Sequence, residues 1–151
     1  MTRTFLIIEA RFYEDIADEL VRGAIAALEA AGARHERIAV PGVLEIPAAL
    51  AIAADARSDL AGPDFAGYVL LGCVIRGETT HYDIVANESA RAVMDLAVSR
   101  RLAVGNGILT VENGDQAWAR AAVGKGDKGA MAARAAIAMA DLKAHFAKPR
   151  G

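Results

Sequence analysis

Apolar runs alternate with helical patterns along most of this chain, and this alternation restricts the fold more than any other feature. Buried strands are predicted from Thr4 to Ala10, from His35 to Val40, from Tyr68 to Val74 and from Leu102 to Thr110. Alternating strands and helices favour right-handed crossovers, which build a parallel sheet with helices on both faces. We therefore predict an α/β fold in which the carboxyl ends of all the strands meet at one edge.

Helical segments occupy the stretches between the predicted strands. Tyr13 to Ala31 places its apolar side chains on one stripe, and Gly32 follows as a natural C-terminal cap. Further helices are predicted from Ile46 to about Arg57, from about His81 to Arg101 and from Gln116 to Ala122. A last helix carries an apolar stripe made of Met131, Ala135, Met139, Leu142 and Phe146.

Glycine marks several of the breaks between these elements. Gly62-Pro63 is predicted to be a loop before the third strand. Gly124, Gly126 and Gly129 are expected to form a loose hinge before the last helix. No repeat or interdomain linker interrupts the pattern, so residues 1–151 are expected to form one domain.

Composition narrows the functional classes. Hydrophobic residues make up 54% of the chain, and this excess predicts some apolar surface buried between subunits. The net charge of -2 offers no basic face for nucleic acid. We expect neither a membrane-spanning helix nor a secretory leader. Because Cys73 is the sole cysteine, no internal disulfide or thiolate metal cluster can form, and we expect a cytoplasmic protein.

The turn Gly77-Glu78-Thr79-Thr80 lies between the third strand and the helix that begins near His81. Glycine gives the backbone freedom, and free N–H groups at a helix start suit a phosphate or another oxyanion. An ordinary helix cap by Thr79 or Thr80 explains the same residues equally well. The Lys-Ser/Thr pair of a Walker P-loop is missing.

Two titratable side chains flank this turn. His81 can move protons near neutral pH beside a bound anion, and the alternative is a solvated histidine at a helix start. Cys73 at the strand end could act as a nucleophile, although such a residue is more often a small buried hydrophobe. Asp83 and Glu88 are near in sequence, but no metal-ligand spacing is present and no metal site is expected.

Four further side chains are candidates for binding. Phe12 follows the first strand, where its ring can stack on a planar ligand or close the core. Glu45 has apolar neighbours, and it can bind a polyhydroxylated ligand or interact with the dipole at the start of the second helix. Arg120 and Lys128, taken alone, are solvated surface charges.

Several motifs, spread over nearly the whole chain, resemble those of the 6,7-dimethyl-8-ribityllumazine synthase family and follow one another in the same order. The resemblance implies a flavodoxin-like three-layer α/β sandwich with a four-stranded parallel sheet. It also implies an enzyme of riboflavin synthesis, a transferase that needs no cofactor and no metal. The motifs are Ala10-Arg11-Phe12, Val40-Pro41-Gly42-Val43-Leu44-Glu45-Ile46-Pro47, Leu71 to Asp83 with its Val74-Ile75-Arg76-Gly77-Glu78-Thr79-Thr80-His81 core, Gly107 to Asn113, and Asp127-Lys128-Gly129.

The implied reaction condenses 5-amino-6-(D-ribitylamino)uracil with 3,4-dihydroxy-2-butanone 4-phosphate to give the lumazine, phosphate and water. By position, Phe12 resembles the aromatic residue that stacks on the pyrimidine. Glu45, with the backbone of Val43 and Leu44, resembles the ribityl clamp. Backbone atoms of the strand end are implied to line the pyrimidine pocket, at Cys73, Val74 and Ile75.

The same resemblance assigns the phosphate end of the site. His81 matches the proton-transfer histidine, and Arg120 matches an arginine that pairs with the phosphate. Lys128 matches a lysine near the pyrimidine carbonyl, and Asn106 takes a position that lines the pocket from the neighbouring subunit. The implied phosphate loop is Gly77, Glu78, Thr79 and Thr80.

Three departures from the family pattern bear on assembly and on the anion site. The turn Val123 to Lys128 differs from the turn associated with icosahedral shells, so we expect a homopentamer or a pair of pentamers. Family members often add an N-terminal segment to a neighbour's sheet, and we expect this segment to be short or absent here. Glu78 replaces a small residue beside the proposed phosphate, and we expect its side chain to point away.

Other functional classes compete with this interpretation. A relative that binds riboflavin or lumazine with low turnover would use the same pocket. A phospho-acceptor of flavodoxin-like fold would need an acidic residue where this chain has Gly72-Cys73. A purely structural shell protein is disfavoured by the altered turn before the last helix.

Overall fold

Four parallel strands form one sheet in the order β2-β1-β3-β4 in the computed structural model, which describes residues 2–58 and 64–148. The strands are β1 (Thr4–Ala10), β2 (Arg34–Val40), β3 (Gly67–Ile75) and β4 (Val104–Val111). Each neighbouring pair is parallel. The predicted α/β fold is therefore confirmed. The predicted Gly62-Pro63 loop lies outside the described residues.

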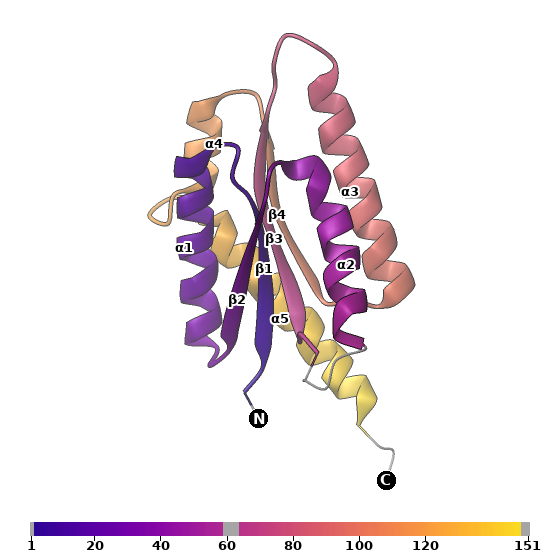
Figure 1. Cartoon of the computed structure of the whole chain (residues 1–151). Coiled ribbons are helices and arrows are strands. Elements are labelled where there is room, and N and C mark those ends of the chain that lie inside the picture. The colour runs from indigo at the N-terminus through magenta and orange to yellow at the C-terminus, as the bar shows by residue number, and fades with distance from the viewer. Residues whose placement is uncertain (1, 59–63, 149–151) are drawn as a thin grey trace.

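Helices cover both faces of this sheet, as Figure 1 shows. One face packs against α1, α4 and α5, and the opposite face packs against α2 and α3. A short 3-10 helix, η1, precedes α2 and was not predicted. The bounds are α1 (Glu14–Ala30), η1 (Val43–Glu45), α2 (Ile46–Ser58), α3 (His81–Arg100), α4 (Gly114–Ala121) and α5 (Lys128–Ala147).

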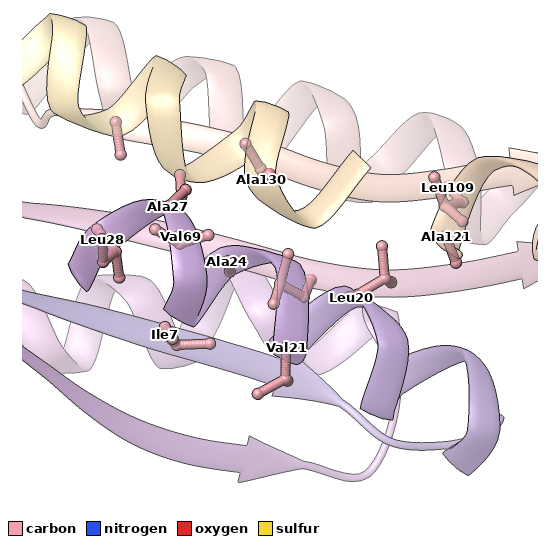
Figure 2. Packing of buried hydrophobic residues seen from close by; sticks show 14 of the residues in the cluster. Ile7, Leu20, Val21, Ala24, Ala27, Leu28, Val69, Leu109, Ala121 and Ala130 are labelled. Carbon is pink, nitrogen blue, oxygen red and sulfur yellow. The ribbon is translucent and has the colours of Figure 1, made fainter. Parts of the chain in front are cut away.

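The central strands β1 and β3 are mostly apolar because both of their faces are covered, and Glu9 of β1 is a buried charged residue among them. On β1, Phe5 and Ile7 belong to the core under α1 and α5. Leu6 and Ile8 alternate with them and belong to the core under α2 and α3. Figure 2 shows Leu20, Leu28 and other side chains of α1 packed above Ile7 and Val69 of the sheet.

Helix α5 approaches α1 and β4 closely because its inner face consists of glycine and alanine. A Cβ atom added at Gly129 would overlap the backbone carbonyl of Leu20 on α1. A Cβ atom added at Gly105 of β4 would overlap the carbonyl of Ala132 on α5. The expectation of a loose hinge at Gly129 is therefore wrong, since Gly129 lies in the first turn of α5 and is buried.

The apolar stripe predicted on the last helix lies on the exposed side of α5. Phe146 is 77% exposed, and Met131, Met139 and Leu142 are also exposed. The small residues Ala130, Ala132, Ala133, Ala136 and Ala140 form the buried side instead. Among the described residues, no helix combines the length and the apolar character that crossing a membrane requires.

The strand ends meet at the upper edge of the sheet in Figure 1. There β1 leads to α1, β2 leads to η1, and β3 leads to α3. The last strand begins two residues later and ends one residue later than predicted, since β4 runs from Val104 to Val111. Asn106 lies within the strand, opposite Leu70 of β3.

We expect Gly129→Ala to destabilise the fold by roughly 1–3 kcal/mol, because the added methyl group forces α5 away from α1. Urea unfolding at one fixed protein concentration measures the change as a lower midpoint. Gly124→Ala is the matched control, since a Cβ atom there meets nothing within 4 Å. Equal midpoints for the two variants would contradict the close-packing interpretation.

Candidate functional site

A pocket of about 320 Å³ opens at the carboxyl ends of β1, β2 and β3. Three separate connections form its walls: the turn between β1 and α1, the η1 segment, and the turn between β3 and α3. The end of β3 forms its floor. The lining residues are Phe12, Tyr13, Gly42, Val43, Leu44, Glu45, Cys73, Val74, Ile75, Gly77, Thr79, His81, Tyr82 and Val85.

Most of the residues predicted for the site meet in this pocket. The residues that line it are Phe12, Val43, Leu44, Glu45, Cys73, Val74, Ile75, Gly77, Thr79 and His81. The residues that do not line it in the single chain are Glu78, Thr80, Asn106, Arg120 and Lys128. Both cations assigned to the site, Arg120 and Lys128, are among the residues that do not line the pocket. Among the residues described, no Arg or Lys lines this single-chain pocket.

The floor of the pocket is apolar and buried. Cys73 and Val74 are each 8% exposed and lie on opposite faces of the sheet. Burial, and to a smaller extent the negative charge of Asp15, raises the pKa of the Cys73 thiol to about 11. A neutral thiol is a poor nucleophile, so the structure favours the buried-hydrophobe interpretation of Cys73.

The η1 wall packs directly on β3 because Gly72 has no side chain. A Cβ atom at Gly72 would lie 2.9 Å from a methyl group of Val43. Val43 is buried, whereas Leu44 and Glu45 are exposed beside the pocket. The Glu45 backbone N–H donates to the Gly42 carbonyl at 3.2 Å and closes the turn. This packing places a carboxylate next to the floor of the pocket.

The start of α3 carries the hydroxyl-rich turn. Thr79 Oγ1 accepts a hydrogen bond from the His81 backbone N–H at 3.3 Å. Thr80 is the N-cap residue, but its side chain makes no capping hydrogen bond. Thr79 therefore meets the capping interpretation in part, and Thr80 does not. Gly77, Thr79 and His81 all face the pocket from this turn.

Arg76, which the sequence did not single out, holds this turn in place. Its Nε donates to Glu112 Oε2 at 2.8 Å, beyond the end of β4. Its guanidinium carbon lies 4.2 Å from the centre of the Tyr82 ring, within the range of a cation–π contact. Because Tyr82 follows His81 directly, Arg76 restrains the helix start that carries the histidine.

The aromatic wall consists of Phe12 and Tyr13. Phe12 is 74% exposed, so the alternative in which it closes the core is wrong. The two rings meet edge to face, with 4.9 Å between centroids and 79° between planes. Tyr13 is partly buried against the core, and burial is the main cause that raises its pKa. The Phe12 ring thus stands at the pocket with a supported neighbour.

The two predicted cations lie on other elements. Arg120 is on α4, where its NH1 donates to the Gln116 carbonyl at 3.1 Å. Lys128 is the first residue of α5. Both helices cover the α1 side of the sheet. Neither side chain reaches the pocket within one chain.

Sequence reasoning missed four lining residues: Tyr13, Gly42, Tyr82 and Val85. Helical spacing could have identified Val85, because it lies one turn after His81 on the same face. Gly42, Tyr13 and Tyr82 each adjoin a residue that was identified. Among residues 2–58 and 64–148, no group of three or more His, Cys, Asp or Glu side chains could hold a metal ion.

Comparison with known proteins places these features in one family. The model of the 6,7-dimethyl-8-ribityllumazine synthase family matches residues 2–144. The 6,7-dimethyl-8-ribityllumazine synthase 1 of Rhizobium meliloti is 64% identical over 138 residues, covering 91% of this chain and 90% of that protein. The 6,7-dimethyl-8-ribityllumazine synthase of Agrobacterium fabrum is 62% identical over 138 residues, covering 91% and 93%.

We expect iodoacetamide to label Cys73 at least about a hundredfold more slowly in the folded protein than in urea at the same pH. A pKa raised from 9.0 to about 11 leaves about a hundredfold less thiolate, and burial hinders access as well. Mass spectrometry of timed samples at pH 8 measures both rates. Equal rates would show a reactive thiolate and would reopen the nucleophile interpretation.

Proposed function

Since the chain belongs to the 6,7-dimethyl-8-ribityllumazine synthase family, we propose that the pocket at the strand ends is its active site. The family's reaction condenses 5-amino-6-(D-ribitylamino)uracil with 3,4-dihydroxy-2-butanone 4-phosphate, in riboflavin biosynthesis. The observation that carries the site assignment is that residues distant in sequence meet in one pocket. Phe12, Glu45 and His81 come from three distant parts of the chain and line one pocket.

The pyrimidine and its ribityl chain occupy the end of the pocket between β1 and η1. The exposed Phe12 ring offers a flat apolar surface on which a heteroaromatic ring can stack. Backbone groups at Cys73, Val74 and Ile75 lie along the floor. The Glu45 carboxylate and the backbone of Val43 and Leu44 accept and donate hydrogen bonds to the hydroxyl groups of the sugar alcohol.

The phosphate of the second substrate occupies the end near α3. The α3 N-terminus carries a partial positive charge, and the Gly77 backbone and the Thr79 hydroxyl face the same space. The carboxylate of Glu78 is absent from the lining residues. This arrangement suits an anion that is bound and then released as free phosphate.

His81 moves the protons of the reaction. The 5-amino group of the pyrimidine attacks the ketone and forms an imine with loss of one water, phosphate leaves, and the ring closes with loss of a second water. Each step transfers a proton, and an imidazole can accept and donate near neutral pH. Holding two reactants in one pocket supplies much of the remaining acceleration.

A second copy of the chain completes the pocket. Arg120, Lys128 and Asn106 lie outside the single-chain pocket, and a neighbouring subunit can bring them to its open side. Apolar side chains are exposed on two helices that could meet such a neighbour. We infer a homopentamer or a pair of pentamers, in the cytoplasm. On these two helices the exposed large apolar residues are Ile84, Met94 and Val98 of α3 and Met131, Met139, Leu142 and Phe146 of α5.

We expect His81→Ala to lower kcat by roughly 10- to 100-fold and to leave measurable activity, because positioning of the two substrates is retained. Absorbance at steady state, with both substrates present, follows lumazine formation. His145→Ala, on the exposed end of α5, is the matched control. Complete loss of activity with fold and substrate binding intact would contradict catalysis led by positioning, and full activity would remove His81 from the reaction.

We expect Arg120→Ala to raise KM for the phosphate substrate about tenfold, because a charge-assisted contact to the phosphate is lost. Arg34→Ala, an exposed arginine on β2, is the control and should leave this KM unchanged.

Co-expression of Arg120→Ala subunits with His81→Ala subunits tests whether the pocket is shared. Mixed assemblies should regain activity if His81 and Arg120 come from different copies, and no recovery would contradict the shared pocket.

A further inference from the structure

A nearly fully buried carboxylate lies just before the Phe12 turn and takes no part in the reaction as described. Glu9 of β1 is 2% exposed. Arg37 of β2 donates to both of its oxygens, from Nε and from NH2, at 2.8 Å each. Arg11 NH1 donates to Oε1 at 2.7 Å. Three charge-assisted hydrogen bonds thus converge on one carboxylate.

The network is electrically balanced, which allows charges to be buried at this place. Burial alone would raise the pKa of Glu9, but the hydrogen bonds from Arg37 and Arg11 outweigh it and the net pKa is lowered. The second amino group of Arg11 pairs with Asp18 of α1. Two arginines therefore face two carboxylates, and strands β1 and β2 are joined to α1.

Arg11 is the member of this network that adjoins the pocket lining, because the lining residue Phe12 follows it directly in the chain. Its guanidinium is held at one end by Glu9 and at the other by Asp18. The turn has few other restraints. Tyr13 is the N-cap of α1 but makes no side-chain capping bond, and the Phe12 ring is 74% exposed. The core does not contact the ring directly, so the position of the ring depends on the backbone of the turn and on the Tyr13 ring that it meets edge to face.

We propose that Glu9 and Asp18 are positioning residues, which act through Arg11 to hold the Phe12 ring at the pocket. This inference rests on the proposed function, in which Phe12 stacks on the pyrimidine. A pre-oriented ring lowers the ordering cost of substrate binding, so the effect appears in the affinity for the pyrimidine substrate. Neither carboxylate lines the pocket.

The competing interpretation is that Glu9 only joins the edge strand to the sheet through Arg37. The two interpretations differ for Asp18: positioning through Arg11 requires its carboxylate, whereas strand pairing through Arg37 does not. Asp18 is 67% exposed at its side chain and pairs directly with Arg11, whereas its charge is the smallest of the influences that act on Arg37. Asp18→Asn therefore releases one end of Arg11 and leaves the strand pairing intact, which makes it the informative variant.

The test measures KM for each substrate in steady-state lumazine formation. For Asp18→Asn we expect KM for the pyrimidine substrate to rise about fivefold, equivalent to about 1 kcal/mol, while kcat and KM for the phosphate substrate stay near the wild-type values. Asp18→Glu should recover most of the loss. Glu14→Gln, which removes a charge from the first turn of α1, should leave the pyrimidine KM unchanged.

A double-variant comparison connects the effect to the ring. If Asp18 acts through Phe12, then Phe12→Ala raises the pyrimidine KM and adding Asp18→Asn causes no further rise. A raised KM in Phe12→Ala with an unchanged KM in Asp18→Asn would overturn the positioning role alone. An unchanged KM in Phe12→Ala would overturn both this role and the proposed site. Glu9→Gln is a second variant, expected to match Asp18→Asn where it folds.

Discussion

Parallel pairing in the order β2-β1-β3-β4 is the constraint on which the rest of the structure depends. The chain leaves β1 toward β2 on one side and returns through β3 to β4 on the other, so the direction of winding reverses between β1 and β3. Open α/β sheets bind ligands in the crevice at such a reversal. The pocket lies there: its walls follow β1, β2 and β3, and no residue of β4 lines it. The position of the site is thus a consequence of strand order.

Much of the fold could be predicted because the spacing of hydrophobic residues indicates strands and helices, and glycine marks many of the breaks between them. β1 was predicted with the observed bounds, and the other strands and the helices differ by a few residues at their ends. What could not be predicted depended on partners distant in sequence. Gly129 suggested flexibility, yet it is glycine because the Leu20 backbone lies against it, more than a hundred positions earlier. The η1 turn is too short to show a period.

The site was predicted less completely, for a related reason. Local motifs identify residues such as Phe12 and His81, which follow the ends of β1 and β3. The sheet then brings these strand ends together at the pocket. Burial then decides questions that residue type leaves open, as it does for Cys73 and for the exposed ring of Phe12. Glu9 was missed altogether. In sequence it is a charged residue at the end of an apolar run, and its arginine partner lies on the neighbouring strand.

The inner face of α5 connects the core to the proposed assembly. Alanine and glycine let α5 approach α1 and β4 closely, but each small side chain removes little apolar area from water, and burial is worth only about 25 cal/mol per Å². The larger apolar residues of the same helix, Met131, Met139, Leu142 and Phe146, are left on its outer side. A neighbour that covers this side would bury apolar area in addition to the small area that the alanine and glycine face buries. The same contact would bring cations to a pocket whose proposed phosphate end has only backbone, hydroxyl and imidazole groups of its own. Folding stability and the completion of the site would then depend on one association.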